Sequence, residues 1–317
     1  MAFSHIPVLL KETIAALSIQ PDGFYVDATV GGGGHSREIV KQLTNGHLLA
    51  IDQDEEALAA AKANLAPWAE KIAFVHDNFQ NLGHILQTSG TEKADGILMD
   101  IGVSSYQLDT AERGFSYHED ALLDMRMDQN KEMPTARDIV NSYSEQELTK
   151  IFYQYGEERW SKRIAQFIVV DRRTKPLETS FDLVKVIQKA IPKKVRMQDK
   201  HPARRVFQAL RIEVNHELDA LEEGLQQAAT HLAPGGRLCV ITFHSLEDRL
   251  VKNAFRRLAE GPPLPAGLPV RSSEYASPFR VCTRKPIEAS PEEQARNSRA
   301  HSAKLRVLER FAQQEEE

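Results

Sequence analysis

Four consecutive glycines, Gly31–Gly34, follow the apolar run 24–26, and Asp52 closes the next apolar run, 48–51. Glycine has no Cβ atom, so such a turn can adopt positive φ and bring backbone amides into contact with a ligand. A carboxylate at the end of the second strand can accept hydrogen bonds from two ribose hydroxyls. Asp52 lies twenty residues after Gly32, close to the ~20-residue separation of nucleotide-type cofactor sites.

Two cofactor classes use a strand, a glycine turn and a helix in this order. The dinucleotide fingerprint has glycines at its first, third and sixth positions, but the sixth position counted from Gly31 is Ser36. Asp27, just before the turn, offers a carboxylate to the ammonium of a methionine end. Both features favour S-adenosylmethionine over a dinucleotide. A turn without ligand is disfavoured, because each glycine costs roughly 0.5 to 1 kcal/mol relative to alanine.

Composition limits the class of protein. The 317 residues allow one domain with an insert, or two domains. Cys239 and Cys282 form neither a disulfide framework nor a metal-ligand spacing, which indicates a reducing cytoplasm and no bound metal. No stretch resembles a signal peptide or reaches the length of a membrane span, so we expect a cytoplasmic protein that does not contact a membrane.

Charge is distributed unevenly along the chain. The net charge is −5, yet residues 1–105 hold 6 Lys and Arg against 13 Asp and Glu, whereas residues 159–211 hold 15 against 4. A basic block inside an acidic protein is typical of a polyanion partner. Taken alone, the block is equally compatible with solvated helix faces.

Strand and helix patterns alternate over the first hundred residues. The expected strands are 25–29, 48–51, 72–75 and 96–99, and the expected helices are 35–43 and 55–65. This alternation predicts an α/β fold with a doubly wound parallel sheet. Ligands of such sheets lie at the carboxyl ends of the strands, where the glycine turn, Asp52, the turn 77–79 and Asp100 would converge.

After Asp100 the alternation stops and helical patterns follow one another. Ser144 and Glu147 form a capping box before an apolar stripe, and helices are expected at 159–174 and 180–191. One long amphipathic helix is expected from Ala203 to Leu232. The sheet then resumes with strand 237–243 and short strands near 281–282 and 305–308. The pattern predicts a helical domain inserted into the α/β fold.

Eight segments spread over nearly the whole chain carry a resemblance to a known family. They are HIPVLL at 5–10, GGGGHS at 31–36, DIGVSSYQLD at 100–109, ERGFS at 112–116, LDMRMD at 123–128, YGEER at 155–159, HPARR at 201–205 and FHSLEDR at 243–249. Together they resemble the bacterial ribosomal RNA small subunit methyltransferase H family, which methylates the exocyclic N4 of a cytosine in the decoding region of 16S rRNA.

The resemblance implies an S-adenosylmethionine-dependent, Rossmann-like core interrupted by an all-helical domain that helps to bind the ribosomal subunit. We place the core at residues 1–109 and 207–317 and the inserted domain at 110–206. The resemblance also implies the cofactor contacts. Gly33, Gly34 and His35 would contact it in the turn, and Asp52 would bind the ribose. Phe79 would lie near the adenine, and Asp100 and Gln107 near the methionine end.

Methylation of a cytosine amino group requires hydrogen-bond acceptors, because the lone pair of the nitrogen is delocalised into the ring. Asp100, Ser104 and Ser105, at the end of the fourth strand, are the candidate catalytic residues. Many amino methyltransferases carry an acid or Asn, two prolines and an aromatic residue there, whereas this chain reads Asp-Ile-Gly-Val at 100–103. The stacking ring is therefore unassigned, with Tyr106, Phe115 and Phe243 as candidates.

RNA phosphates are the expected partners of the basic block. Its candidate RNA-binding residues are Arg159, Lys162, Arg163, Arg172, Arg173, Lys175, Arg204 and Arg205. The expected partner is small-subunit rRNA within the assembled 30S particle, and a homodimer is left open.

Three other polar residues each have two interpretations. His244 either caps a helix or contacts the substrate. Asp124 and Asp128 fit a role in bracing the insert better than a role as metal ligands.

Two other functions compete with rRNA methylation. An NAD-dependent oxidoreductase would be protected by a dinucleotide, and the missing sixth glycine argues against it. A non-catalytic RNA-binding assembly factor would incorporate no methyl group, and the convergence of four cofactor contacts argues against it.

Overall fold

The computed structural model of the chain describes residues 7–196, 201–261 and 277–311. The chain divides into two compact units. The core unit comprises residues 1–102 and 218–317, and the helical unit comprises residues 103–217. The segment His5–Ile6 and the proline-rich residues 262–265 lie outside the described residues.

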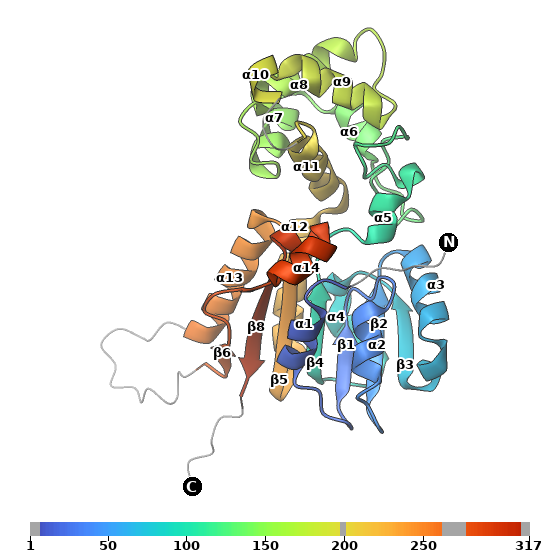
Figure 1. Ribbon diagram of the computed structural model, residues 1–317, viewed down its shortest axis with the longest axis vertical. Coiled ribbons are helices and arrows are strands. Elements are labelled where there is room, and N and C mark those ends of the chain that lie inside the picture. The colour runs from blue at the N-terminus through green and yellow to red at the C-terminus, as the bar shows by residue number, and fades with distance from the viewer. Residues whose placement is uncertain (1–6, 197–200, 262–276, 312–317) are drawn as a thin grey trace, which may run out of the picture. The chain divides into compact units, whose positions relative to one another are not determined.

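Eight strands of the described chain form one sheet in the core unit, in the order β3-β2-β1-β4-β5-β8-β6, with β7 paired to β8 (Figure 1). Their bounds are β1 Phe24–Asp27, β2 His47–Asp52, β3 Ile72–His76, β4 Ala94–Asp100, β5 Leu232–Thr242, β6 Phe279–Val281, β7 Ile287–Glu288 and β8 Lys304–Arg310. Strands β1 to β5 pair in parallel, and β8 runs antiparallel to β5. This confirms the predicted doubly wound α/β core.

Helices cover both faces of the sheet. They are α1 Leu10–Leu17, α2 Gly34–Val40, α3 Glu55–Asn64, α4 Leu82–Thr88, α12 Glu217–His231, α13 Ser245–Glu260 and α14 Pro291–Arg296. Alternate residues of β2 enter opposite apolar clusters: Leu48 packs with α1, α2 and α3, whereas Leu49 packs with α4, α12 and α13. Both faces of the central strands are therefore buried, as the continuous apolar runs of the sequence predict.

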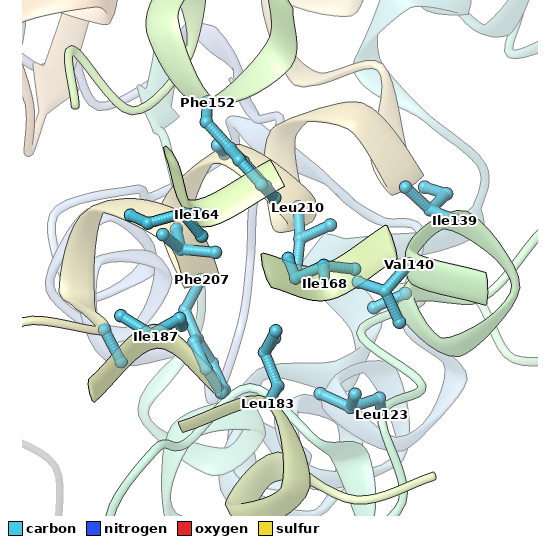
Figure 2. Packing of buried hydrophobic residues seen from close by; sticks show 14 of the residues in the cluster. Leu123, Ile139, Val140, Phe152, Ile164, Ile168, Leu183, Ile187, Phe207 and Leu210 are labelled. Carbon is cyan, nitrogen blue, oxygen red and sulfur yellow. The ribbon is translucent and has the colours of Figure 1, made fainter. Parts of the chain in front are cut away.

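The helical unit contains α5 Ser105–Asp109, α6 Ala136–Ser142, α7 Glu145–Gln154, α8 Ser161–Asp171, α9 Ser180–Ala190, α10 Lys193–Arg196 and α11 Arg204–Asn215. Its centre is apolar, and Figure 2 shows Phe152, Leu210 and Phe207 among the side chains buried there. The predicted capping box before α7 is confirmed: Ser144 Oγ accepts from Glu147 N at 3.2 Å, and Glu147 Oε2 accepts from Ser144 N at 2.7 Å.

The single long helix predicted from Ala203 to Leu232 is wrong. The chain breaks at His216, whose φ is 50°, and forms α11 and α12. The apolar stripe is shared between two cores: Leu210 packs in the helical unit and Leu225 in the core unit. The continuous 3.6-residue period conceals this break, because both helices keep the same phase.

The helical unit also has bounds that differ from the expected 110–206. Val103 and Leu108 pack against the apolar cluster of the helical unit, so the unit begins at residue 103. Helix α11 buries its apolar face in the same cluster, so the unit ends at residue 217.

The segments 112–116 and 123–128 interlock within the helical unit. Arg113 Nη2 donates to the carbonyls of Arg126 and Met127, at 3.1 and 2.8 Å. Gly114 has a φ of +73°, and a Cβ atom there would lie 2.3 Å from the carbonyl oxygen of Leu122. Asp124 accepts two hydrogen bonds of 2.8 Å from the Arg126 guanidinium. These motifs of the sequence therefore have a bracing role, as we expected for Asp124.

Within the described ranges, no helix combines the length and apolar character needed to cross a membrane. No group of three or more His, Cys, Asp or Glu side chains in those ranges is arranged to hold a metal ion.

Candidate active site

The glycine turn joins β1 to α2 with positive φ at Gly31 (50°) and Gly33 (80°). Its start is fixed by the amide of Val30, which donates to the carbonyl of Ile51 at 2.8 Å. Gly34 has a different reason to be glycine: a Cβ atom there would lie 2.3 Å from Pro7 Cγ. Pro7 thus packs directly on the turn, which reasoning from the glycine pattern alone did not reveal.

Asp52, at the end of β2, is hydrogen-bonded to the turn. Its Oδ2 accepts from Gly31 N at 2.8 Å, and its Oδ1 accepts from Asp54 N at 3.0 Å. Burial raises the pKa of Asp52 to about 6. A carboxylate can accept about four hydrogen bonds, so Asp52 retains capacity for ribose hydroxyls.

Asp27, at the end of β1, is almost completely buried and accepts a 2.6 Å hydrogen bond from Ser36 Oγ. Ser36 occupies the sixth position of the turn, where the dinucleotide fingerprint has glycine. The serine that replaces this glycine is therefore the hydrogen-bond donor to Asp27. Burial raises the pKa of Asp27 to about 6, although the Ser36 hydrogen bond opposes the shift.

Asp100, at the end of β4, carries the least satisfied carboxyl group of the site. Its Oδ1 is buried and has no hydrogen-bond partner among the described residues. Burial raises its pKa to about 8, with further contributions from the negative charges of Asp27 and Glu247. A buried polar atom without a partner is costly. The carboxyl group therefore fits a ligand that brings a cation or hydrogen-bond donors, as the ammonium of S-adenosylmethionine would.

His35 lies beneath this carboxyl group in the first turn of α2. Its Nδ1 is 3.6 Å from Asp100 Oδ2, and its Nε2 is 3.1 Å from the carbonyl oxygen of Val8. The Val8 carbonyl can only accept, so Nε2 carries a proton. Nδ1 of the ring then faces the carboxyl group of Asp100.

Glu247 was missed in the sequence, although it is only 1% exposed. Its Oε2 accepts from the amides of Phe243 and His244, at 2.7 and 3.1 Å, and its Oε1 lies 2.9 Å from His244 Nε2. Glu247 N in turn donates to His244 Nδ1, which completes a capping box for α13. Of the two interpretations of His244, the structure therefore supports the cap. The signal was the spacing of His244 and Glu247, but His is an unusual residue at this position.

Phe79 follows β3 and is 9% exposed. Its ring packs so closely on α12 that a Cβ atom at Gly224 would lie 2.5 Å away. The preceding turn is tied to β2, because Asn78 Nδ2 donates to Gln53 Oε1 at 2.7 Å. The adenine contact of Phe79 stays a prediction.

Apart from Phe243, the other predicted residues lie in the helical unit. Ser104 and Gln107 cap α5 reciprocally, with bonds of 3.2 and 3.0 Å, and the side chain of Ser105 lies outside what the structure describes. Their contacts with cofactor or substrate stay predictions. Phe115 is 5% exposed inside the helical core, which disfavours it as a stacking ring. Phe243 is only partly buried, beside Gly102, and remains a candidate.

The basic block forms two groups at opposite ends of α8. Arg205 Nη1 donates to the carbonyl of Glu157 at 2.8 Å, which brings the start of α11 beside the start of α8. The exposed residues of this first group are Arg159, Lys162, Arg163, Arg204 and Arg205, and those of the second are Arg173 and Lys175. Arg172 differs from the expectation: it is half-buried and donates to the carbonyl of Val140 at 2.7 Å, so it braces α6.

Comparisons with known proteins agree with this geometry. Residues 2–311 match the model of the MraW methylase family. A protein of Finegoldia magna named ribosomal RNA small subunit methyltransferase H is 54% identical over 312 residues, covering 98% of this chain and 100% of the relative. A relative with the same name in Clostridioides difficile is 53% identical, and the match covers 98% of this chain and 100% of the relative. Another, in Symbiobacterium thermophilum, is 51% identical, and the match covers 100% of this chain and 99% of the relative.

Proposed function

The chain belongs to the MraW methylase family, and from this membership we propose that it methylates small-subunit rRNA, using S-adenosylmethionine, at the exocyclic N4 of a cytosine in the decoding region. The names of the full-length relatives support the rRNA substrate. One structural observation carries the cofactor assignment: three parallel strands end in aspartates around a glycine turn, and one of these, Asp100, lacks a partner for a buried oxygen.

The chain's own residues divide the cofactor between them. Asp52 would hold the ribose hydroxyls, and the Gly33–Gly34 turn would lie against the nucleoside. Asp100, supported by His35, would hold the ammonium of the methionine end. When bound, S-adenosylmethionine supplies a methyl group on a positively charged sulfur, which the surrounding carboxylates also favour electrostatically.

Transfer requires the cytosine amino nitrogen to be held in line with that methyl group, which alone can account for much of the rate enhancement. The nitrogen gains the methyl group and loses a proton. Ser104, Ser105 or a backbone carbonyl of residues 100–103 would accept hydrogen bonds from this amino group. Phe243, at the end of β5, is the remaining partly exposed ring of the core unit that we proposed for stacking.

The target cytosine must leave its stack before it can react, at an expense of a few kcal/mol. Basic residues at the two ends of α8 would hold the flanking phosphates while the base is displaced. Recognition through phosphate positions and RNA shape needs few base-specific contacts. The assembled 30S particle presents such a fixed arrangement of phosphates, and we propose it as the substrate.

Mass spectrometry of nucleosides tests this function. The full chain is incubated with isotopically labelled S-adenosylmethionine and with 30S particles, or naked 16S rRNA, from cells that lack the protein. We expect labelled N4-methylcytidine in a nuclease fragment of the decoding region, and less of it with the Asp100→Asn variant when S-adenosylmethionine is kept below the concentration that saturates the variant. Label in another nucleoside or another fragment would contradict the proposed position. Absence of any label would instead favour the non-catalytic assembly factor.

A further inference from the structure

Three rings from separated segments of the helical unit form a stack that the proposed chemistry does not use. Tyr117 and His201 lie nearly parallel, with ring centroids 4.7 Å apart and an interplanar angle of 11°. The ring centroid of His118 lies 4.5 Å from that of Tyr117 and 5.8 Å from that of His201. On the inner side, Tyr117 meets the edge of Phe207, which is 3% exposed in the helical core. The stack therefore runs from the core to the surface, where His118 is exposed.

The polar atoms of this stack are little used by the protein. His201 Nδ1 accepts a 3.3 Å hydrogen bond from Ala203 N. The Tyr117 hydroxyl and His201 Nε2 make no hydrogen bond with another described residue. Burial, and then the neighbouring His118, lower the pKa of His201, so that its ring is neutral at pH 7. A neutral ring with an unused nitrogen can both stack on a base and hydrogen-bond its edge.

Cations adjoin the rings in sequence and in space. Arg204 and Arg205 begin α11 three and four residues after His201, and both are exposed. Arg204 makes no ion pair or side-chain hydrogen bond within the described residues. The Arg205 contact with Glu157 brings exposed Arg159 into the same group. Rings beside phosphate-binding cations are the combination with which proteins bind single-stranded nucleic acid.

We propose that Tyr117, His118 and His201 form a stacking site for one unpaired nucleobase of the RNA substrate, with Arg204 on the adjoining phosphate. This inference rests on the proposed function only for the identity of the RNA. All three rings belong to the helical unit, whereas the carboxylates proposed for the cofactor belong to the core unit, and we assign to the rings a nucleotide other than the one that reacts. Through these rings the basic surface of the helical unit would contact a base as well as phosphates.

Simple core packing is the competing explanation, and it accounts for Tyr117 on Phe207. It does not account for the exposed His118 or for the unused hydrogen-bonding atoms. The two explanations differ in what they predict for base-free polyanions. A phosphate surface binds any polyanion through charge, whereas a stacking site adds affinity for ligands that carry bases.

The test uses the full chain saturated with S-adenosylhomocysteine and two probes: a short single-stranded oligocytidylate containing one 2-aminopurine, and inorganic polyphosphate of similar charge. We expect 2-aminopurine fluorescence to be quenched on binding. His118→Ala combined with His201→Leu should raise the Kd for the oligonucleotide by about 5- to 150-fold, the range for one base–ring stack. The Kd for polyphosphate should stay nearly constant. Arg204→Ala should weaken binding of both probes, and His201→Phe, which keeps a ring, should preserve the oligonucleotide affinity.

Equal weakening of both probes by the ring variants, or no weakening of either, would overturn the base site. Folding of the helical unit is checked separately by the far-ultraviolet circular dichroism spectrum and the melting temperature, which should be nearly unchanged in all variants. Failure of the proposed function looks different. If the wild-type chain methylates no ribosomal particle yet binds the oligonucleotide in a ring-dependent way, the base site stands and the methylation proposal falls.

Discussion

Aspartates at the strand ends of the core unit and aspartates of the helical unit differ in what surrounds them. Burial raises the pKa of Asp27 and Asp52 to about 6 and that of Asp100 to about 8. In the helical unit burial also raises the pKa of Asp124, but the hydrogen bonds and charge of Arg126 outweigh it and leave the pKa below its ordinary value. Asp248 shows that the core unit can do the same, because Arg306 and Lys304 lower its pKa against burial.

The difference separates bracing from binding. A carboxylate that braces the fold receives its cation from the chain, and folding alone satisfies it. Within the described residues, the three strand-end carboxylates contact a serine hydroxyl, backbone amides and a histidine ring, and none of them forms an ion pair with Lys or Arg. Such groups reduce the stability of the free protein and become favourable when a cationic ligand arrives, which is common at functional sites.

The first prediction breaks the helical unit while sparing the carboxylates. Phe152 is fully buried in the apolar cluster of that unit (Figure 2), so Phe152→Ala should cost about 3 to 5 kcal/mol of its stability. We expect the affinity for S-adenosylhomocysteine, measured by calorimetry, to remain. Phe255→Ala, on the buried face of α13 in the core unit, is the matched variant and should lower that affinity. A loss of affinity in the first variant would show that the two units are not separable in this way.

The second prediction concerns pH. A carboxyl group whose pKa is raised by folding binds a proton that the unfolded chain has already released, so it destabilises the fold as pH rises between those two pKa values. For Asp100 this window runs from the ordinary aspartate pKa of 3.8 to about 8. Asp100→Asn should therefore raise the melting temperature of the cofactor-free protein at about pH 8.5, with little change near pH 4.

Asp124→Asn is the control for the pH experiment. Its lowered pKa means that its stabilising contribution is present above the ordinary pKa and is lost only as pH falls through the lowered value. The variant should therefore be destabilised across the whole range in which Asp100→Asn gains stability. Parallel melting curves for the two variants would remove the distinction between bracing and binding carboxylates.

The third prediction concerns the ribose. Asp52→Ala should weaken S-adenosylhomocysteine binding by about 1.5 to 3 kcal/mol, because two hydroxyls would lose a charged acceptor. Asp54→Ala is the neighbouring control, since its side chain caps α3 through Glu56 N at 3.1 Å. It should cost about 1 kcal/mol of stability and leave the affinity unchanged. Calorimetry that ranks the two variants the other way would place the ribose elsewhere.

The smallest expected effect lies at the far end of α8. Arg173→Glu with Lys175→Glu should raise the Kd for 16S rRNA. The slope of log Kd against log salt concentration should also become shallower, by the amount expected for the loss of about two phosphate contacts. Arg172 is left unchanged because it holds the Val140 carbonyl. Cofactor affinity should not change. An unaltered salt slope would mean that this end of the basic block is only a solvated helix face.

The fold was predictable where local pattern and burial agree. Apolar runs followed by turns gave the parallel strands, and the spacing of Ser144 and Glu147 gave the start of α7. The break at His216 was not predictable, because the apolar stripe continues through it. Its cause is tertiary: the two halves of the stripe bury against different cores.

The candidate site was predictable in composition but not in detail. The glycine turn and Asp52 follow from spacing, and the acidic ends of β1 and β4 from the strand pattern. Contacts between distant segments carry no local signal, and so Pro7 on Gly34 and Glu247 near Asp100 were missed. Conversely, Arg172 has the charge of an RNA contact but is used by the fold.

Calorimetry with two ligands tests most directly the claim that Asp100 awaits the ammonium of the cofactor. S-adenosylhomocysteine carries that ammonium, whereas methylthioadenosine keeps the nucleoside and lacks it. Binding of each ligand is measured to the wild-type chain and to Asp100→Asn. We expect the affinity of Asp100→Asn for S-adenosylhomocysteine to fall at least about tenfold, as for loss of a hydrogen bond between charged groups, and its affinity for methylthioadenosine to stay almost unchanged. Equal losses for both ligands, or no loss for either, would contradict it.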